Sequence, residues 1–225
     1  MHDRVRRAQE LSSAGRVDEA EREYRAATED EDPDAYVELA ALLRDNERLS
    51  DAEAVYRSAI AAGILDVLIP FGNMLTEIPG REEEGVALYQ DAIAAGDEFG
   101  HVNLAITLDR LGRADQAETE FKRAIQTSDP LARRNYGIFL YEHGRYTEAE
   151  RILRDAISRG DTKAHVDLGN VLADTGRQRE AEHEYQTAIS EGAALTTAHK
   201  AYGLLLRELG RDEEANSHLR LSQEG

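Results

Sequence analysis

Residues Gly112-Arg113-Ala114-Asp115-Gln116-Ala117-Glu118 are the clearest copy of a phrase that recurs along the whole chain. The phrase is a Gly-Arg pair followed, four residues after the arginine, by a small residue; in the second copy Glu47 replaces the glycine. The small residues that end the seven copies are Ala20, Ala52, Gly85, Ala117, Ala149, Ala181 and Ala215. They are 32, 33, 32, 32, 32 and 34 residues apart, and so constant a period is typical of a solenoid protein.

Composition limits the fold class and the kinds of partner. The 225 residues include four prolines and no tryptophan, which fits a chain of helices with an aliphatic core. Lys and Arg number 27 against 45 Asp and Glu, so the net charge is -18. This charge opposes binding to nucleic acid and to anionic membranes; it either only keeps the protein soluble or favours basic partners. With no cysteine, no apolar leader and no run of ~20 apolar residues, we expect a cytoplasmic protein.

Each period is predicted to form two helices. In the fourth period Leu104, Ala105 and Leu108 recur at helical spacing, and Gly112 provides the left-handed residue that ends a helix. A second helix follows, with Ala117 in its apolar stripe. Four second helices begin with a sequence typical of a capping box, in which a short polar side chain and a glutamate bond to the first turn. These pairs are Asp18 with Glu21, Ser50 with Glu53, Asp115 with Glu118, and Thr147 with Glu150.

Small and large residues alternate at fixed places, which predicts close helix packing. Small residues lie twelve before most of the seven period markers, and a large residue, often tyrosine, lies four after each. The complete set resembles the tetratricopeptide repeat, and the sixth period shows the resemblance well. Its matching residues are Leu168, Gly169, Leu172, Gly176, Ala181, Tyr185 and Ala188. Gly-Asp links, such as Gly96-Asp97 and Gly160-Asp161, are similar to those of the related Sel1-like repeats.

The resemblance implies an all-α fold, a right-handed superhelical solenoid of about seven helix-turn-helix repeats. We expect one solenoid domain over residues 1–225. Its approximate repeats are 1–32, 33–65, 66–97, 98–129, 130–161, 162–194 and 195–225.

No group of residues points to catalysis or to a bound metal. The carboxylates are too numerous for their pairs to be informative, and there is no Gly-rich phosphate loop after a strand. Of the seven histidines, His101, His165 and His199 share one repeat position, where a packing role outweighs metal binding. We therefore predict a protein that is not an enzyme and has no cofactor and no metal.

The candidate binding site comes from the inner face that the resemblance assigns to the first helices. Counting back from the period markers, the third to fifth periods place an apolar strip with two asparagines on that face. The predicted partner-binding residues are Val67, Phe71, Met74, Phe99, Asn103, Ile106, Asn135, Ile138 and Tyr141. An exposed apolar patch bordered by polar groups is typical of a protein-binding surface.

Two alternatives remain for this strip. Tight superhelical curvature would bury it, or the third period, with Pro70, Pro79 and Gly85, has lost its regular structure. Asn103 and Asn135 match asparagines that, in the family, hydrogen-bond an extended peptide backbone. Val102 and Ile106 stand where chaperone-binding members carry a lysine and an asparagine, so binding of chaperone tails is disfavoured.

We predict a non-enzymatic scaffold that binds a protein or peptide, basic or apolar, in this groove. One alternative is a self-associating array, a homo-oligomer formed through the strip or through the C-terminal end around Leu219. Another is an accessory or regulatory subunit of an enzyme.

Overall fold

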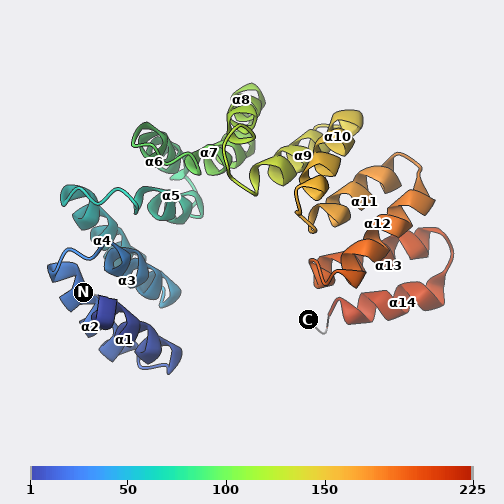
Figure 1. Cartoon of the computed structure of the whole chain (residues 1–225). Helices are drawn as coiled ribbons and strands as arrows, with labels where there is room; N and C mark the ends of the chain where they lie inside the picture. Colours follow the sequence, from blue (N-terminus) through green and yellow to red (C-terminus); the bar gives the residue numbers. More distant parts are fainter. Residues whose placement is uncertain (1, 224–225) are drawn as a thin grey trace. The chain divides into compact units, whose positions relative to one another are not determined.

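The computed structural model describes residues 2–223, and in this range the chain forms fourteen α-helices and no strand (Figure 1). Fourteen is the number that seven two-helix repeats require, so the all-α repeat architecture is confirmed. The helices are α1 (His2–Ser13), α2 (Val17–Glu29), α3 (Pro33–Asp45), α4 (Leu49–Ala61), α5 (Leu68–Thr76), α6 (Glu82–Ala94), α7 (Gly100–Arg110), α8 (Ala114–Ala124), α9 (Ala132–Glu142), α10 (Tyr146–Ser158), α11 (Ala164–Asp174), α12 (Gln178–Ser190), α13 (Leu195–Glu208) and α14 (Asp212–Leu221).

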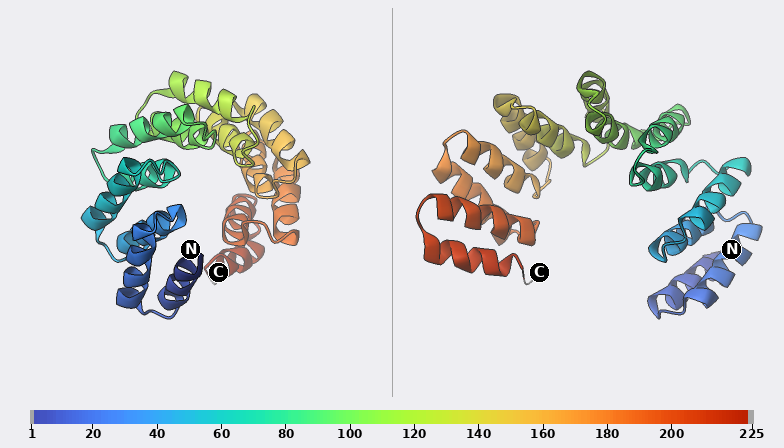
Figure 2. Two further views of the ribbon diagram at one scale, coloured as in Figure 1. Left: turned by 60° about the vertical axis from the view of Figure 1, so that its left-hand side comes forward. Right: turned by 180° about the vertical axis from the view of Figure 1, so that it is seen from behind.

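The helices group into two compact units, residues 1–117 and 118–225, with the boundary inside α8. In the first unit α1 packs on α2, α3 on α4 and α5 on α6. In the second unit α9 packs on α10, α11 on α12 and α13 on α14, and Figures 1 and 2 show these as antiparallel pairs that follow one another. A single solenoid domain over 1–225 stays a prediction.

The buried rows predicted from the period form the core of each unit. Six of the seven period markers are alanines, and all six are fully buried. The tyrosines four residues after them, among them Tyr24 and Tyr56, are also buried. In the sixth repeat the backbone of Gly169 lies so close to Tyr185 that a β-carbon would come within 2.4 Å of the ring. Small residues thus let paired helices approach closely while the large ring fills the adjacent space.

First helices end as predicted. Gly112 has a φ angle of +74°, the left-handed conformation that a side chain disfavours. The next amide, of Arg113, donates to the carbonyl of Leu108 over 2.9 Å, which closes the helix end.

The predicted capping boxes are wrong for α2, α4 and α10, because these helices begin earlier than the sequence suggested. The residue before the first helical residue is the arginine of the Gly-Arg pair, for example Arg16 before α2, and its side chain makes no capping hydrogen bond. Asp18 therefore lies inside the first turn of α2. It still lies at the positive end of the helix dipole.

The glutamates assigned to those boxes instead join one repeat to the next. In five cases the arginine of a Gly-Arg pair bonds the glutamate that directly follows the period marker of the preceding repeat, at 2.6–2.8 Å. The five pairs are Arg48 with Glu21, Arg81 with Glu53, Arg145 with Glu118, Arg177 with Glu150, and Arg211 with Glu182. In the third repeat Val86 takes the place of the glutamate, and Arg113 bonds the more exposed Glu83 at 3.1 Å.

Glu118 shows how strongly these bridges favour the ionised carboxylate. Burial by itself raises the pKa of Glu118, but hydrogen bonds from Lys122, Arg145 and Tyr136 outweigh burial and hold the pKa at about 2. The carboxylate therefore stays charged at any pH at which the protein is expected to work.

An aspartate precedes several first helices and orders the linker there. The carboxylates of Asp32, Asp97, Asp129 and Asp161 each accept the backbone N–H two residues on, at 2.8–3.2 Å. This is the Asx turn, in which a short side chain replaces a backbone acceptor. The Gly-Asp links of the sequence are thus ordered turns.

Candidate functional site

First helices lie closer to one another than second helices do. In the first unit α1 contacts α3 and α5 contacts α7, and in the second unit α11 contacts both α9 and α13. Among α2, α4 and α6 in the first unit, and among α10, α12 and α14 in the second, no pair of second helices makes contacts as extensive. Within each unit the first helices therefore form the inner side of the stack, and their outward-facing residues are the candidate site.

Helix α5 is displaced by one residue relative to the first helices of other repeats. In the sixth repeat Tyr185 packs against Gly169, sixteen residues earlier, whereas in the third repeat Tyr89 packs against Gly72, seventeen residues earlier. The additional residue of this 33-residue period thus lies between the two helices. Counting back from Gly85 across that turn assigns each residue of α5 to the wrong place by one.

Because of this displacement, three of the predicted site residues are wrong. Val67, Phe71 and Met74 were expected to be exposed on the inner face, but they are only 0%, 4% and 1% exposed. Phe71 stacks on Tyr56 with the ring centroids 5.0 Å apart. In the true register these three occupy the places of Ala164, Leu168 and Val171, which are core residues of the sixth repeat.

The true register places Asn73 on the inner face instead. The Tyr89 hydroxyl donates to Asn73 Oδ1 over 2.7 Å, and the equivalent Tyr185 hydroxyl donates to Asn170 Oδ1 over 2.8 Å. Both amide groups are oriented by a buried tyrosine, and their N–H donors bond to none of the residues between 2 and 223. Sequence reasoning missed Asn73 because the 33-residue interval was not traced to the turn between α5 and α6.

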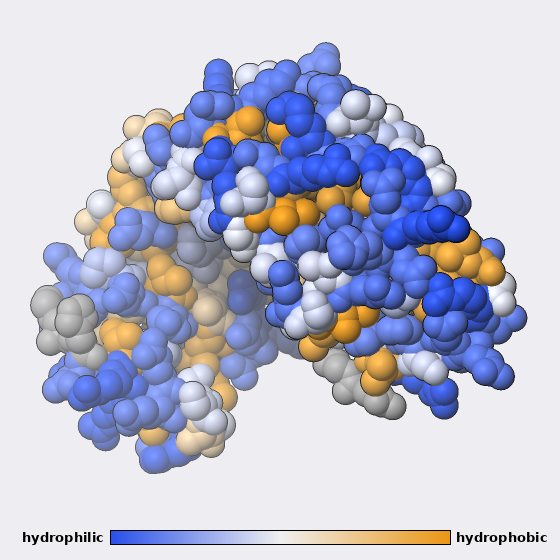
Figure 3. Space-filling view, turned by 45° about the vertical axis from the view of Figure 1, so that its right-hand side comes forward, coloured by the Kyte–Doolittle hydropathy of each residue, from blue (hydrophilic) through white to orange (hydrophobic). Residues whose placement is uncertain are grey.

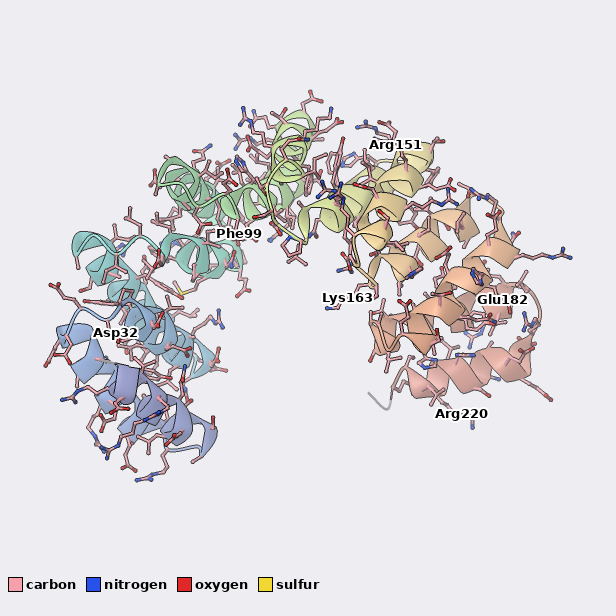
Figure 4. All side chains as sticks on the ribbon, viewed as in Figure 1. Asp32, Phe99, Arg151, Lys163, Glu182 and Arg220 are labelled. Carbon is pink, nitrogen blue, oxygen red and sulfur yellow. The ribbon has the colours of Figure 1, made fainter. Side chains whose placement is uncertain are left out.

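The other predicted residues of the first unit lie on or beside α7. Phe99, labelled in Figure 4, directly precedes α7 and is 52% exposed. Ile106 is 37% exposed and Asn103 is half-buried. Of the predicted strip, this unit therefore exposes only two apolar side chains, Phe99 and Ile106. On the face that Figure 3 shows, hydrophobic residues lie in separate patches between hydrophilic ones.

In the second unit Asn135, Ile138 and Tyr141 lie on α9, and all three are half-buried. The Asn135 amide donates to the carbonyl of Leu131 in its own helical turn over 2.9 Å, so this donor is already used. The Tyr141 hydroxyl donates to Asp174 Oδ2 over 2.7 Å. Burial, followed by this hydrogen bond, raises the pKa of Tyr141 to about 12.

Tyr141 opens onto a cavity of about 170 Å³ that the sequence did not predict. Helices α9, α11, α12 and α13 all contribute to it. Its lining residues are Tyr141, Asn170, Ala173, Asp174, Tyr185, Ala201, Leu204, Leu205 and Glu208. The available signal was the repeat position seven before the period marker, which is acidic in the last three repeats as Glu142, Asp174 and Glu208.

Two of the three histidines that share one repeat position, His165 and His199, contact side chains of the next helix. The ring of His165 is half-buried and its Nδ1 lies 2.6 Å from Glu184. His199 Nδ1 lies 2.8 Å from His218 Nδ1, across the last helix pair. No cluster of three or more His, Cys, Asp or Glu side chains that could hold a metal occurs in the described part of the chain.

A family model described as the tetratricopeptide repeat matches residues 5–66, 102–164 and 166–222. The chain belongs to the tetratricopeptide repeat family. The unmatched interval, residues 67–101, contains α5 with its displaced register, together with α6. No curated protein matches the sequence.

Solved structures of tetratricopeptide and Sel1 repeat proteins share the fold. A tetratricopeptide repeat protein from Parabacteroides merdae superimposes with a TM-score of 0.74 at 18% identity, over 99% of this chain and 92% of that one. A Sel1 repeat protein from Oxalobacter formigenes gives 0.67 at 19% identity, over 98% and 99%. MamA from Desulfovibrio magneticus gives 0.56 at 17%, over 71% and 93%.

Among the residues described, no helix combines the length and the hydropathy that a membrane span requires.

Proposed function

We propose that this tetratricopeptide repeat protein is a non-catalytic scaffold that binds a segment of a partner protein on its first helices. The observation that carries the proposal is the inner face of α9, α11 and α13, where the exposed Leu204 and the half-buried Tyr141 line a cavity. Concave sites with an apolar lining and a few placed polar groups are typical of binding sites.

Asn73 and Asn170 add a reason to expect an extended segment. Each amide is held in one orientation by a buried tyrosine, so its N–H group loses little entropy when it binds a ligand carbonyl. Side chains of a partner bound to the second unit would then contact apolar groups such as Leu204.

A matched pair of leucine variants tests the proposal. Leu204 on α13 and Leu221 on α14 are 44% and 48% exposed, but only Leu204 is on the inner face. The tagged full-length protein and each Leu→Asp variant would be used for affinity capture from the native host, with quantitative mass spectrometry. We expect Leu204→Asp to lower partner recovery by ~10-fold, as for loss of a hot-spot residue, and Leu221→Asp to leave it unchanged.

Circular dichroism of both variants verifies that they fold. Equal partner recovery by folded Leu204→Asp and by the wild type would overturn the assignment to the inner face.

Self-association is a second candidate, favoured by four exposed leucines in or beside the last helix pair. They are Leu195, Leu204, Leu209 and Leu221. Light scattering at micromolar concentration distinguishes it: a dimer that Leu221→Asp dissociates supports this candidate, and a monomeric wild type excludes it.

A further inference from the structure

The cavity beside Tyr141 is too small for most cofactors and metabolites. Its volume of about 170 Å³ compares with ~300–1,000 Å³ for pockets that take a whole small molecule. It is open to the inner face and lies between three first helices of one unit. Such a cavity suits a single side chain of a bound segment.

The charged groups that line the cavity are all acidic. Asp174 and Glu208 contribute carboxylates, and neither lysine nor arginine is among the lining residues. Asp174 Oδ2 accepts the Tyr141 hydroxyl, while Glu208 has no hydrogen bond or ion pair with the chain over residues 2–223. Arg207 precedes Glu208 in sequence but does not line the cavity. A cationic guest would therefore find carboxylate oxygens that the protein itself has not neutralised.

The same acidic groups act on the pKa of a buried tyrosine. Tyr185 lines the cavity, and burial is the main reason that its pKa is raised. Tyr141, Asp174 and Glu208 add to the increase, because a negative surrounding disfavours the phenolate.

The remaining wall is apolar and suits a long aliphatic side chain. Ala173, Ala201 and Leu204 line it, and the two alanines leave room beside the leucine. Lysine and arginine lay their methylene groups along apolar surface while the charged end reaches polar groups. The lining therefore matches both parts of such a side chain.

We propose that this cavity binds a lysine or arginine side chain of the partner segment. The inference rests on the proposed scaffold function and specifies its partner as basic at this point. Asp174 and Glu208 accept hydrogen bonds from the cationic end, and Leu204 with Ala201 contacts the methylene groups.

The first unit differs in part at the repeat position of Asp174 and Glu208. That position holds Ser13, Asp45, Glu77 in the corrected register, and Arg110. Asp45 is paired with Arg44 at 3.2 Å, and the guanidinium of Arg110 donates to the carbonyl of Thr76 over 3.1 Å.

Nuclear magnetic resonance of the full-length protein tests the proposal directly. The probes are N-acetyl-arginine N-methylamide and its neutral isostere, the citrulline derivative. We expect the arginine probe to cause saturable shifts at Tyr141, Ala173 and Leu204. Binding of the citrulline probe, and binding of arginine to Asp174→Asn/Glu208→Gln, should each be weaker by ~10-fold, because charge-assisted hydrogen bonds are lost.

Glu142→Gln is the matched control, since Glu142 stands at the same repeat position as Asp174 but does not line the cavity. This variant should bind the arginine probe as the wild type does. Equal binding of citrulline and arginine, or no saturable shift with arginine, overturns the proposal.

The arginine-probe experiment and the capture experiment test different claims, so either claim can fail alone. If capture depends on Leu204 but the arginine probe fails to bind, the scaffold function stands and the basic-side-chain site falls. If the arginine probe binds but capture is unaffected by Leu204→Asp, the cavity assignment stands and the partner-binding function falls.

Discussion

Arginine is the residue of the Gly-Arg pair that joins successive repeats. The side chain of Arg81 is the fullest example: it bonds both carboxylate oxygens of Glu53 in the preceding repeat and both of Glu84 in its own helix, at 2.7–2.8 Å. Bidentate geometry of this kind fixes the relative position of two elements as well as attracting opposite charges. The bridge is therefore a device for the interface between repeats.

Replacing Arg81 should cost more stability than replacing its counterpart Arg113. The Arg81→Ala variant loses a pair with the half-buried Glu53, and we expect the free energy of unfolding to fall by ~1 kcal/mol, the upper end for partly exposed ion pairs. Arg113→Ala loses a longer contact to the exposed Glu83, so a fall under ~0.5 kcal/mol is expected. Urea denaturation measures both, and a larger loss for Arg113→Ala would contradict this account.

Gly85, the one period marker that is not alanine, lies where the neighbouring helix leaves no room for a β-carbon. A β-carbon there would lie 2.3 Å from Thr76 Cγ2 and 3.0 Å from the Gly72 carbonyl oxygen. We expect Gly85→Ala to destabilise the protein by ~1–3 kcal/mol, as for other overpacked sites, although alanine favours the helix. Adding Thr76→Ser removes the nearest methyl group and should restore part of the loss in thermal unfolding. An unchanged melting temperature for Gly85→Ala alone would show that position 85 has room for a β-carbon.

At the scale of elements, the last helix pair is joined by two histidines. His199 on α13 and His218 on α14 share one hydrogen bond between their Nδ1 atoms, and the Tyr202 ring lies 4.5 Å from that of His218. One ring must donate and the other accept, so the two rings cannot both be imidazolium ions and keep this bond. Burial, followed by the charge of His199, lowers the pKa of His218, while Glu214 acts in the opposite direction.

Stability of this helix pair should therefore fall in mild acid. Because the folded state lowers the pKa of His218 below its ordinary 6.5, the unfolded chain binds the proton more readily. The stabilisation is complete above pH 6.5 and is lost as the pH falls below it. We expect His218→Gln to lose less stability than the wild type between pH 7.5 and pH 5, measured by urea unfolding.

His183→Gln on α12 is the control, because His183 is exposed. It should keep the pH dependence of the wild type. If the free energy of unfolding changed equally with pH in all three proteins, the histidine pair would not be the cause of the pH dependence.

Element boundaries illustrate how far helix signals can be read from sequence. The periodic apolar residues predicted two helices per repeat, and the glycines marked where first helices end. The starts of second helices were misplaced, because a polar residue with a glutamate three later is a weak signal. Those glutamates face the next repeat, where an arginine binds them, for example Arg177 with Glu150.

At the scale of the whole molecule, stability should be a sum of local terms. Each repeat contacts mainly its neighbours, so unfolding spreads from one repeat to the next and is not uniform. Leu206 on α13 is fully buried, and Leu206→Ala should cost ~2–5 kcal/mol locally. Hydrogen exchange should lose protection in α12–α14 and keep it in α1–α4. Equal loss in all helices would indicate one cooperative domain.

The sequence alone determined the architecture, because helix formation and close packing depend on residues a few positions apart. The period of 32–34 residues, the glycines that end first helices and the rows of alanine and tyrosine that form the core can all be read from the sequence. Only the tertiary structure decided which faces are exposed. One additional residue between α5 and α6 rotates the helix by ~100°, and it moves Phe71 into the core and Asn73 onto the inner face.

The candidate site depended on the tertiary structure for the same reason. Tyr141 was predicted from its repeat position, whereas its neighbours Asp174 and Glu208 are 33 and 67 residues further along the chain. Local sequence sets which residue types each helix carries, and the packing of three first helices brings them around one cavity. The Gly-Arg phrase thus specified how each helix pair forms, and the stacking of repeats within a unit decided which side chains share a face.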